Sequence, residues 1–320
     1  MPSRSTAFDA YLREASGGRN GVPRLIAAIT LIVVSYTIPI AAVVIFAGGS
    51  GRLAFEDPKS RTGIALMLLS IVWLVPATAF ALRLVHRRRF AGVLGIGGGV
   101  SWRQFWRAFI LMAIVLVAMT LAGLLYDPRI DRGPASLSMW AAFAPFFMVL
   151  IMLQTAAEEV FFRGYLVQTL ALRFRGPWIW CGFPALVFTL LHWNGDVSTA
   201  MNLAGLASVA AFAVAATVLL VRTGNLGAAM GFHFANNTVA LLFFSSSTAF
   251  NPIALFVLPP IESPEWSAFD AALFAVVQIA AIVLVAILLI HERSPFRIAA
   301  DVAKMEVSGD PEPMEGAPDR

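Results

Sequence analysis

The sequence predicts an all-α membrane protein, a polytopic transmembrane helical bundle with about eight spanning helices. Of its 320 residues 59% are hydrophobic and only 13% are charged, and the mean hydropathy is +0.78. So few charges cannot cover a water-soluble globule of this size, so most of the apolar surface is expected to face lipid. The single cysteine, Cys181, excludes a disulfide within the chain and a metal site built from several cysteines.

Eight apolar runs are each expected to cross the bilayer, which needs about 20 residues of helix. The first run is too long for an ordinary cleaved signal peptide, so we expect a retained helix. The fourth run is longer than one crossing needs and the fifth is short. The runs cover residues 25–48, 62–82, 105–126, 135–170, 177–192, 197–221, 226–244 and 267–290.

These runs divide the chain into five parts. A polar cytoplasmic segment precedes three helices that carry a basic interfacial loop; four helices then form a core, followed by an outer loop with the last helix, and by a cytoplasmic tail. The tail ends in a Pro-, Gly- and acid-rich stretch typical of disorder. The five parts are residues 1–24, 25–134, 135–246, 247–290 and 291–320.

The basic residues predict the topology, because short cytoplasmic loops retain Lys and Arg. With the N-terminus inside, seventeen of the 23 Lys and Arg fall on the inner side and five on the outer side, while Arg163 lies within a helix. Both termini are therefore expected in the cytoplasm. The pI near 9.7 reflects this scatter of short basic clusters, and no aromatic-rich module indicates nucleic-acid binding.

Three ionisable residues interrupt the fourth run, where each costs about 2.5–3.5 kcal/mol to insert. Glu159 and Arg163 are four residues apart with the acid first, the favourable order for an ion pair on one helix face. Glu158 lies about 100° round the helix from Glu159 and is left without that counter-ion. We therefore expect the Glu158 carboxylate to face a cavity, water or another polar group.

Two of the four histidines lie inside apolar runs. His192 ends the fifth run, and His233 lies in the seventh, where Asn237 follows it by four residues and so shares its helix face. One buried histidine alone is usually a hydrogen-bond partner between helices. Two of them, with an asparagine and an unpaired glutamate, favour a catalytic site. Simple counting places His192 near the outer end of its helix, whereas Glu158 and His233 fall in the inner half.

Taken in order, these motifs resemble one protein family. Glu-Glu-x-x-x-Arg at Glu158, Glu159 and Arg163, Phe-x-x-x-His at Phe188 and His192, and His-x-x-x-Asn at His233 and Asn237 are similar to the motifs of the type II CAAX prenyl protease and bacteriocin-processing (CPBP, ABI) family of intramembrane proteases. The resemblance covers residues 135–244. It implies an all-helical endopeptidase, a membrane hydrolase whose cavity opens towards the cytoplasm, and a multi-pass location that we expect to be a bacterial inner (plasma) membrane.

Peptide hydrolysis needs an activated water and donors aimed at the developing oxyanion. We assign the base to Glu158, with His192 holding the same water. His233 and Asn237 would donate to the carbonyl oxygen, as the resemblance also implies, and Glu159 and Arg163 would support the helix. Phe188 is expected to pack rather than react.

A zinc site remains an alternative, because two histidines and a glutamate are the ligands of many catalytic zinc ions. The candidates are Glu158, His192 and His233, but no His-Glu-x-x-His spacing places two ligands one turn apart. We favour a metal-independent mechanism, with no certain cofactor.

The expected partners are membrane lipids and a peptide or protein substrate, for which a prenylated C-terminal CAAX sequence is the form the resemblance implies. Two other functions stay open: a proton-coupled transporter in which Glu158 binds the proton, and a non-catalytic membrane scaffold or immunity protein. A haem site on His192 and His233 leaves the other polar residues without a role.

Overall fold

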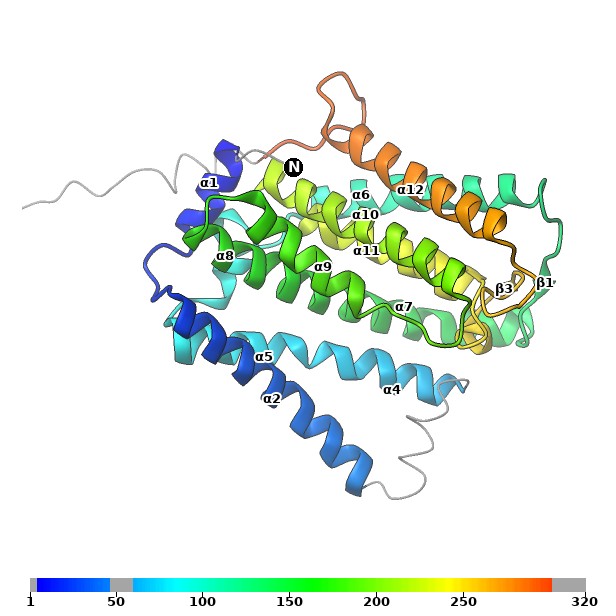
Figure 1. Ribbon diagram of the computed structural model, residues 1–320, viewed down its shortest axis with the longest axis horizontal. Coiled ribbons are helices and arrows are strands. Elements are labelled where there is room, and N and C mark those ends of the chain that lie inside the picture. The colour runs from blue at the N-terminus through cyan, green and yellow to red at the C-terminus, as the bar shows by residue number, and fades with distance from the viewer. Residues whose placement is uncertain (1–4, 47–59, 301–320) are drawn as a thin grey trace, which may run out of the picture.

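The computed structural model describes residues 5–46 and 60–300 of the chain, and over these residues the protein is a bundle of long helices (Figure 1). The all-α class is confirmed. The predicted disordered stretch, 306–320, lies outside the described residues. The helices are α1 (Thr6–Arg13), α2 (Val22–Phe46), α4 (Arg61–Val72), α5 (Leu74–Ala81), α6 (Trp102–Gly123), α7 (Leu137–Glu159), α8 (Gln168–Arg173), α9 (Phe183–Leu190), α10 (Thr199–Thr223), α11 (Gly227–Asn237) and α12 (Ala268–Ile290).

Shorter turns join several of these helices. Four of them are π-helical turns. One extends α5 (Leu82–His86), one joins α7 to α8 (Val160–Val167), one leads into α9 (Trp178–Gly182) and one extends α11 (Thr238–Phe243). Short 3-10 turns cover Phe90–Val93, Ile96–Gly98 and Asn251–Ile253.

Serine residues define where five helices begin. Each serine side chain accepts a hydrogen bond from a backbone N–H three residues later, which satisfies a donor that the first helical turn leaves free. In α12 the cap is reciprocal, because Asp270 also accepts from the backbone of Ser267. The five caps are Ser5, Ser60, Ser136, Ser198 and Ser267.

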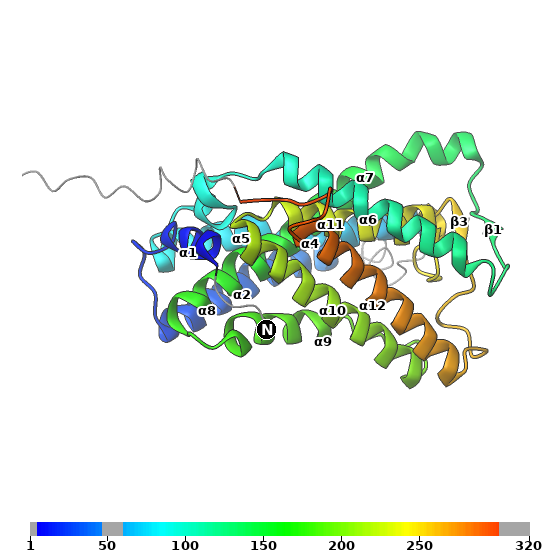
Figure 2. The same ribbon diagram turned by 90° about the horizontal axis from the view of Figure 1, so that it is seen from above.

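The helix α11 lies at the centre of the bundle, in contact with α6, α7 and α10 (Figures 1 and 2). Its first nine residues are all buried. At Gly231 the backbone of α6 comes so close that a Cβ atom would lie 2.0 Å from the carbonyl oxygen of Phe105. Only glycine allows this approach, which places the rest of α11, including His233, deep among its neighbours.

The structure does not confirm the predicted count of eight spans. Within the described residues five helical segments are long and apolar enough to cross a membrane: Arg61–His86, Trp102–Gly123, Leu137–Arg173, Thr199–Thr223 and Ala268–Ile290. Two apolar helices, Val22–Ile38 and Trp178–Leu190, are shorter. The predicted span 226–244 corresponds largely to α11, whose apolar residues face other helices rather than lipid. Hydropathy does not distinguish these two surroundings, since both exclude water.

The two ends of the bundle are built differently. At one end α1 packs against α8 and α10, and the Tyr11 hydroxyl donates to the carbonyl of Val93 over 2.8 Å. Burial of the Arg88 side chain at this end lowers its pKa to about 10.

At the other end a small sheet joins three loops: β1 (Asp131–Arg132) pairs antiparallel with β3 (Phe256–Val257), which pairs parallel with β2 (Phe244–Ser245).

The close approach at Gly231 predicts opposite effects for the same change at two glycines. Gly231→Ala should lower the free energy of unfolding by roughly 1–3 kcal/mol, because the added methyl overlaps backbone that cannot turn aside. Gly205→Ala, within α10, where a Cβ meets nothing within 4 Å, should raise it by about 0.5–1 kcal/mol. Thermal unfolding of both variants in detergent measures the difference. Equal effects would contradict this account of how α11 packs.

Candidate active site

The helices α7 and α11 meet along a polar seam in an otherwise apolar bundle. The Nδ2 of Asn237 donates to the Oε1 of Gln154 over 3.1 Å, and the Nε2 of His233 lies 3.6 Å from the Oε2 of Glu158. Gln154 and Glu158 are one turn apart on α7, as are His233 and Asn237 on α11, so each pair shares a face. The later residue on one helix meets the earlier residue on the other, which is the pairing of two antiparallel helices.

A buried ionic cluster lies beside this seam. The Nη1 of Arg163 donates to the Oε1 of Glu159 over 2.9 Å, so the predicted ion pair is confirmed. The same oxygen lies 2.8 Å from the Nδ1 of His233. Glu159 is fully buried, and Arg163 and His233 are 2% and 3% exposed. Because a carboxylate accepts, the Nδ1 of His233 carries the hydrogen in this bond, and its Nε2 faces Glu158.

The carboxylate of Glu158 lies close to these charges, and among the described residues no arginine is paired with it. Its side chain is 14% exposed, and its Oε2 is buried without a hydrogen bond.

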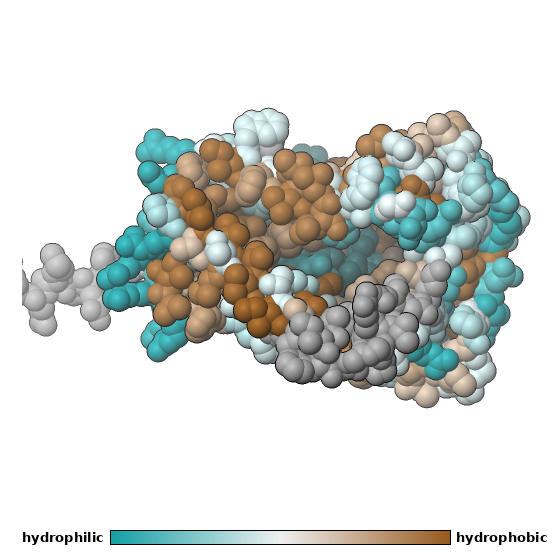
Figure 3. Space-filling model, turned by 60° about the horizontal axis from the view of Figure 1, so that its bottom comes forward, coloured by the Kyte–Doolittle hydropathy of each residue, from teal (hydrophilic) through white to brown (hydrophobic). Residues whose placement is uncertain are grey.

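The face that carries α2 and α4 is hollowed. Figure 3 shows apolar side chains around much of the rim and hydrophilic residues on the floor of the hollow. Helix α4 packs against α7, the helix that carries Glu158, so this face adjoins the partly exposed carboxylate. Apolar walls around a polar floor are typical of a ligand-binding hollow.

The ring of Phe188 connects His192 to the cluster. The guanidinium carbon of Arg163 lies 4.4 Å from the centre of the Phe188 ring, a cation–π contact. Ring centres are 4.6 Å apart for Phe188 and His192 and 6.0 Å apart for Phe188 and His233. Both histidines thus lie against the ring of Phe188.

His192 is nevertheless separate from the charged cluster. It is exposed, and its Nδ1 lies 2.8 Å from the carbonyl oxygen of Phe188. In the described part of the chain no hydrogen bond joins it to Glu158. Nor do the described residues contain any group of three His, Cys, Asp or Glu side chains placed to hold a metal ion. The zinc set considered from the sequence, Glu158, His192 and His233, is therefore not assembled in this arrangement.

The segment after Glu159 is a π-helical turn, Val160–Val167. Such turns leave backbone carbonyls without their usual helical partners and often occur at functional sites. The Tyr11 hydroxyl lies 3.2 Å from the carbonyl oxygen of Gly164, within this turn. The N-terminal helix α1 therefore braces the segment that carries Arg163.

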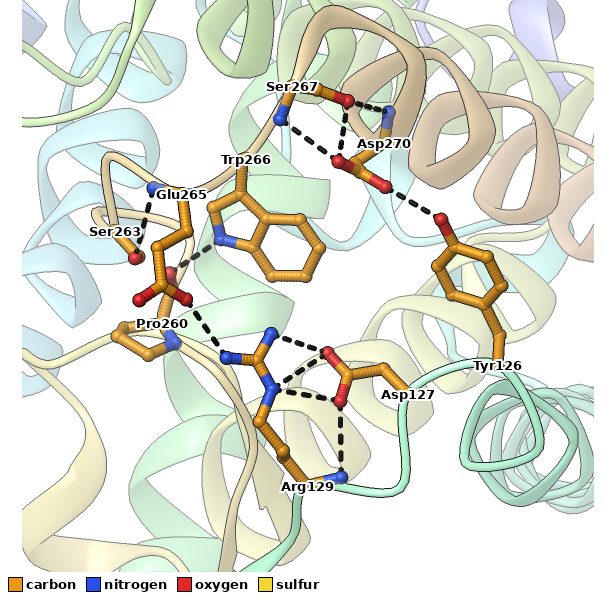
Figure 4. Close-up of polar contacts among 9 residues, drawn as sticks. All are labelled: Tyr126, Asp127, Arg129, Pro260, Ser263, Glu265, Trp266, Ser267 and Asp270. Atoms are coloured by element: carbon orange, nitrogen blue, oxygen red, sulfur yellow. Dashed lines mark hydrogen bonds and ion pairs between the residues drawn. The ribbon is translucent and has the colours of Figure 1, made fainter.

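A second polar cluster lies at the end of the bundle that carries the sheet (Figure 4). Arg129 donates to Asp127 and to Glu265, over 2.8 and 2.9 Å, and hydrogen bonds from Arg129 lower the pKa of the Asp127 carboxyl. Tyr126 donates to Asp270 over 2.8 Å. Two cavities of about 320 and 360 Å³ adjoin these residues. Because its charges are exposed and paired with each other, we interpret the cluster as a clasp between two loops.

Comparison with known proteins shows which family this chain resembles. The family described as type II CAAX prenyl endopeptidase Rce1-like matches residues 140–239. It is also 25% identical over 213 residues to the uncharacterized protein YyaK of Bacillus subtilis (strain 168), a match that covers 64% of this chain and 70% of YyaK. Among solved structures none matches the chain significantly.

The Rce1-like segment begins in α7 and ends two residues after Asn237, so it contains the whole polar seam and the ionic cluster. The family is a protease family, and with its apolar helices the chain is an integral membrane protein. The sequence motifs did not reveal Gln154, Asn236 or Phe212, although all three contact motif residues. Their only sequence signal is polarity or bulk within an apolar run.

The buried ionic cluster of Glu159, Arg163 and His233 predicts a large loss of stability when its arginine is removed. Arg163→Met should lower the free energy of unfolding by roughly 3–5 kcal/mol, because the Glu159 carboxylate then stays buried without its guanidinium. Arg163→Met combined with Glu159→Gln should recover part of the loss. Arg129→Met removes two ion pairs near the surface, with Asp127 and Glu265, and should change stability little. Denaturation in detergent compares the three, and similar losses for Arg163→Met and Arg129→Met would refute the burial argument.

Proposed function

We propose that this protein is an intramembrane endopeptidase of the CAAX prenyl protease type, which hydrolyses a peptide bond near the membrane with a water activated by Glu158. One observation carries the proposal. Within the matched segment, a carboxylate with a buried oxygen free of hydrogen bonds lies beside the His233 imidazole, on the side of the bundle where a hollow opens. A base placed this way has both a proton donor and a route to water.

In this mechanism Glu158 takes a proton from a water as the water oxygen attacks the carbonyl carbon. The developing oxyanion accepts hydrogen bonds from Asn237 and from the Nε2 of His233. When the carbon–nitrogen bond breaks, the proton held by Glu158 passes to the leaving amine. His192 holds the water from the side of Phe188.

The geometry of the imidazole supports His233 as a donor. Its Nδ1 lies 2.8 Å from the Glu159 carboxylate, so this nitrogen is used for the ion cluster. Its Nε2 lies on the side of Glu158. In the proposed mechanism this second ring nitrogen carries the hydrogen that the substrate oxygen accepts.

The proposed substrate is a peptide or protein segment held at the membrane by an apolar group. The apolar rim of the hollow suits such a group, and a prenylated C-terminal CAAX peptide is the form that the family description names. The lipids around the bundle are then partners of the reaction, since the substrate arrives through them. We place the protein in a bacterial inner membrane.

The first test is cleavage of a panel of prenylated and unprenylated peptides by the purified protein, followed by mass spectrometry. Glu158→Gln and His233→Ala should each lower kcat at least 100-fold, as expected for loss of a general base or of an oxyanion donor. Glu265→Gln, in the outer clasp, is the matched control and should cleave like the wild type. Cleavage that survives both changes in the cluster would remove the mechanism.

A transporter gives a different pattern with the same proteins. Reconstituted in vesicles, it would carry protons or a solute in a way that Glu158→Gln abolishes, while no peptide is ever cut. A scaffold would show neither activity.

Metal dependence has its own test. Glu158, His192 and His233 do not form a ligand set in this arrangement. Dialysis against a strong chelator should therefore leave peptide cleavage within about twofold of the untreated protein. In a zinc enzyme the same treatment would cause a much larger loss, because a catalytic zinc ion contributes several kcal/mol to lowering the activation barrier. Metal analysis of the dialysed sample is the control. Loss of activity that added zinc restores would show a metalloenzyme instead.

A further inference from the structure

A chain of three amides borders the charged cluster. The Nδ2 of Asn236 donates to the Oδ1 of Asn237, and the Nδ2 of Asn237 donates to the Oε1 of Gln154, both over 3.1 Å. Gln154 is on α7, one turn before Glu158, and is 4% exposed. The chain thus connects the proposed oxyanion donor on α11 to the helix that carries the proposed base.

The chain ties the orientation of the Asn237 amide to those of its two neighbours. A carboxamide has an acceptor oxygen and a nitrogen with two hydrogens. With Gln154 and Asn236 oriented as observed, exchanging the two ends of the Asn237 amide would place its oxygen against the Gln154 oxygen and its nitrogen against the Asn236 nitrogen, so both hydrogen bonds would be lost. In the observed orientation one Nδ2 hydrogen is committed to Gln154 and the second stays free to donate.

We propose that Gln154 and Asn236 are positioning residues that hold the Asn237 amide with its free hydrogen ready for the substrate oxygen. The inference rests on the proposed function, because it gives Asn237 a task only if a carbonyl is attacked beside it. A donor fixed before the reaction need not be reoriented during it, which is how an oxyanion site gains most of its effect. Burial of Gln154 strengthens the restraint, since water does not compete for its oxygen.

A purely structural role for Gln154 makes a different prediction. If the bond to Asn237 only joins α7 to α11, then removing Gln154 weakens folding and affects the reaction whether or not Asn237 is present. If Gln154 acts through Asn237, its removal has no further effect once Asn237 is gone. A double-mutant cycle separates the two cases.

The cycle uses the full-length protein and the best peptide from the cleavage panel, with kcat and KM measured for each variant. Asn237→Ala should lower kcat about 100-fold or more. Gln154→Met, similar in length but without an acceptor, should lower kcat about tenfold with KM within about twofold, because the interaction is made in the transition state. The double variant should match Asn237→Ala within about twofold. Thr155→Val, next to Gln154 and bonded to the Met152 carbonyl of its own helix, should cleave like the wild type.

Asn236→Ala repeats the cycle with a half-buried residue, whose change carries little risk to folding. It should also lower kcat and lose its effect in the Asn237→Ala background. A double variant whose loss equals the product of the two single losses would overturn the inference, as would unchanged kcat in both Gln154→Met and Asn236→Ala. Failure of the proposed function looks different, since Glu158→Gln then has no effect or the wild type cleaves nothing.

Discussion

The site depends on one buried carboxylate, that of Glu159, and on the two groups that are hydrogen-bonded to it. Its Oε1 accepts from Arg163 and from His233, so one oxygen joins a π-helical turn of its own helix to a second helix. Burying such an ion is costly, and the attraction offsets the cost only where partners and geometry are good. Because Glu159 fixes the Nδ1 side of the imidazole, the Nε2 side has one direction left, towards Glu158. The proposed mechanism uses this placement of the Nε2 of His233 beside Glu158.

Because α7 and α11 pack antiparallel, the position of His233 opposite Glu158 determines the other contact of the seam. Once His233 is opposite Glu158, the residue one turn later on α11 is opposite the residue one turn earlier on α7, and these are Asn237 and Gln154. The depth of α11 is set by Gly231, where α6 allows no side chain. Packing at one glycine and charge at one glutamate therefore place the polar groups of two helices in register.

Sequence periodicity predicted what lies within single helices. The four-residue spacing predicted the Glu159–Arg163 pair, and the polar interruptions of apolar runs identified Glu158 and His233. What lies between helices was not predictable in the same way. Nothing in the spacing shows that His233 contacts both glutamates, or that Gln154 and Asn236 meet Asn237, because these contacts depend on which helix faces join. The span count is not confirmed for a related reason, since a helix surrounded by protein and one surrounded by lipid are both apolar.

The aromatic ring of Phe188 contacts residues of all three short motifs. Its face lies against the guanidinium of Arg163, and its ring centre is 4.6 Å from that of His192, just beyond the end of α9, and 6.0 Å from that of His233. Because Phe188 is buried, it shields the guanidinium from water on this side. The phenylalanine therefore packs, as the sequence led us to expect. Among the described residues His233 is the histidine that lies within 4 Å of Glu158, whereas His192 is exposed and bonded to the carbonyl of Phe188. The buried histidine is therefore the one that the ionic cluster itself holds beside the proposed base.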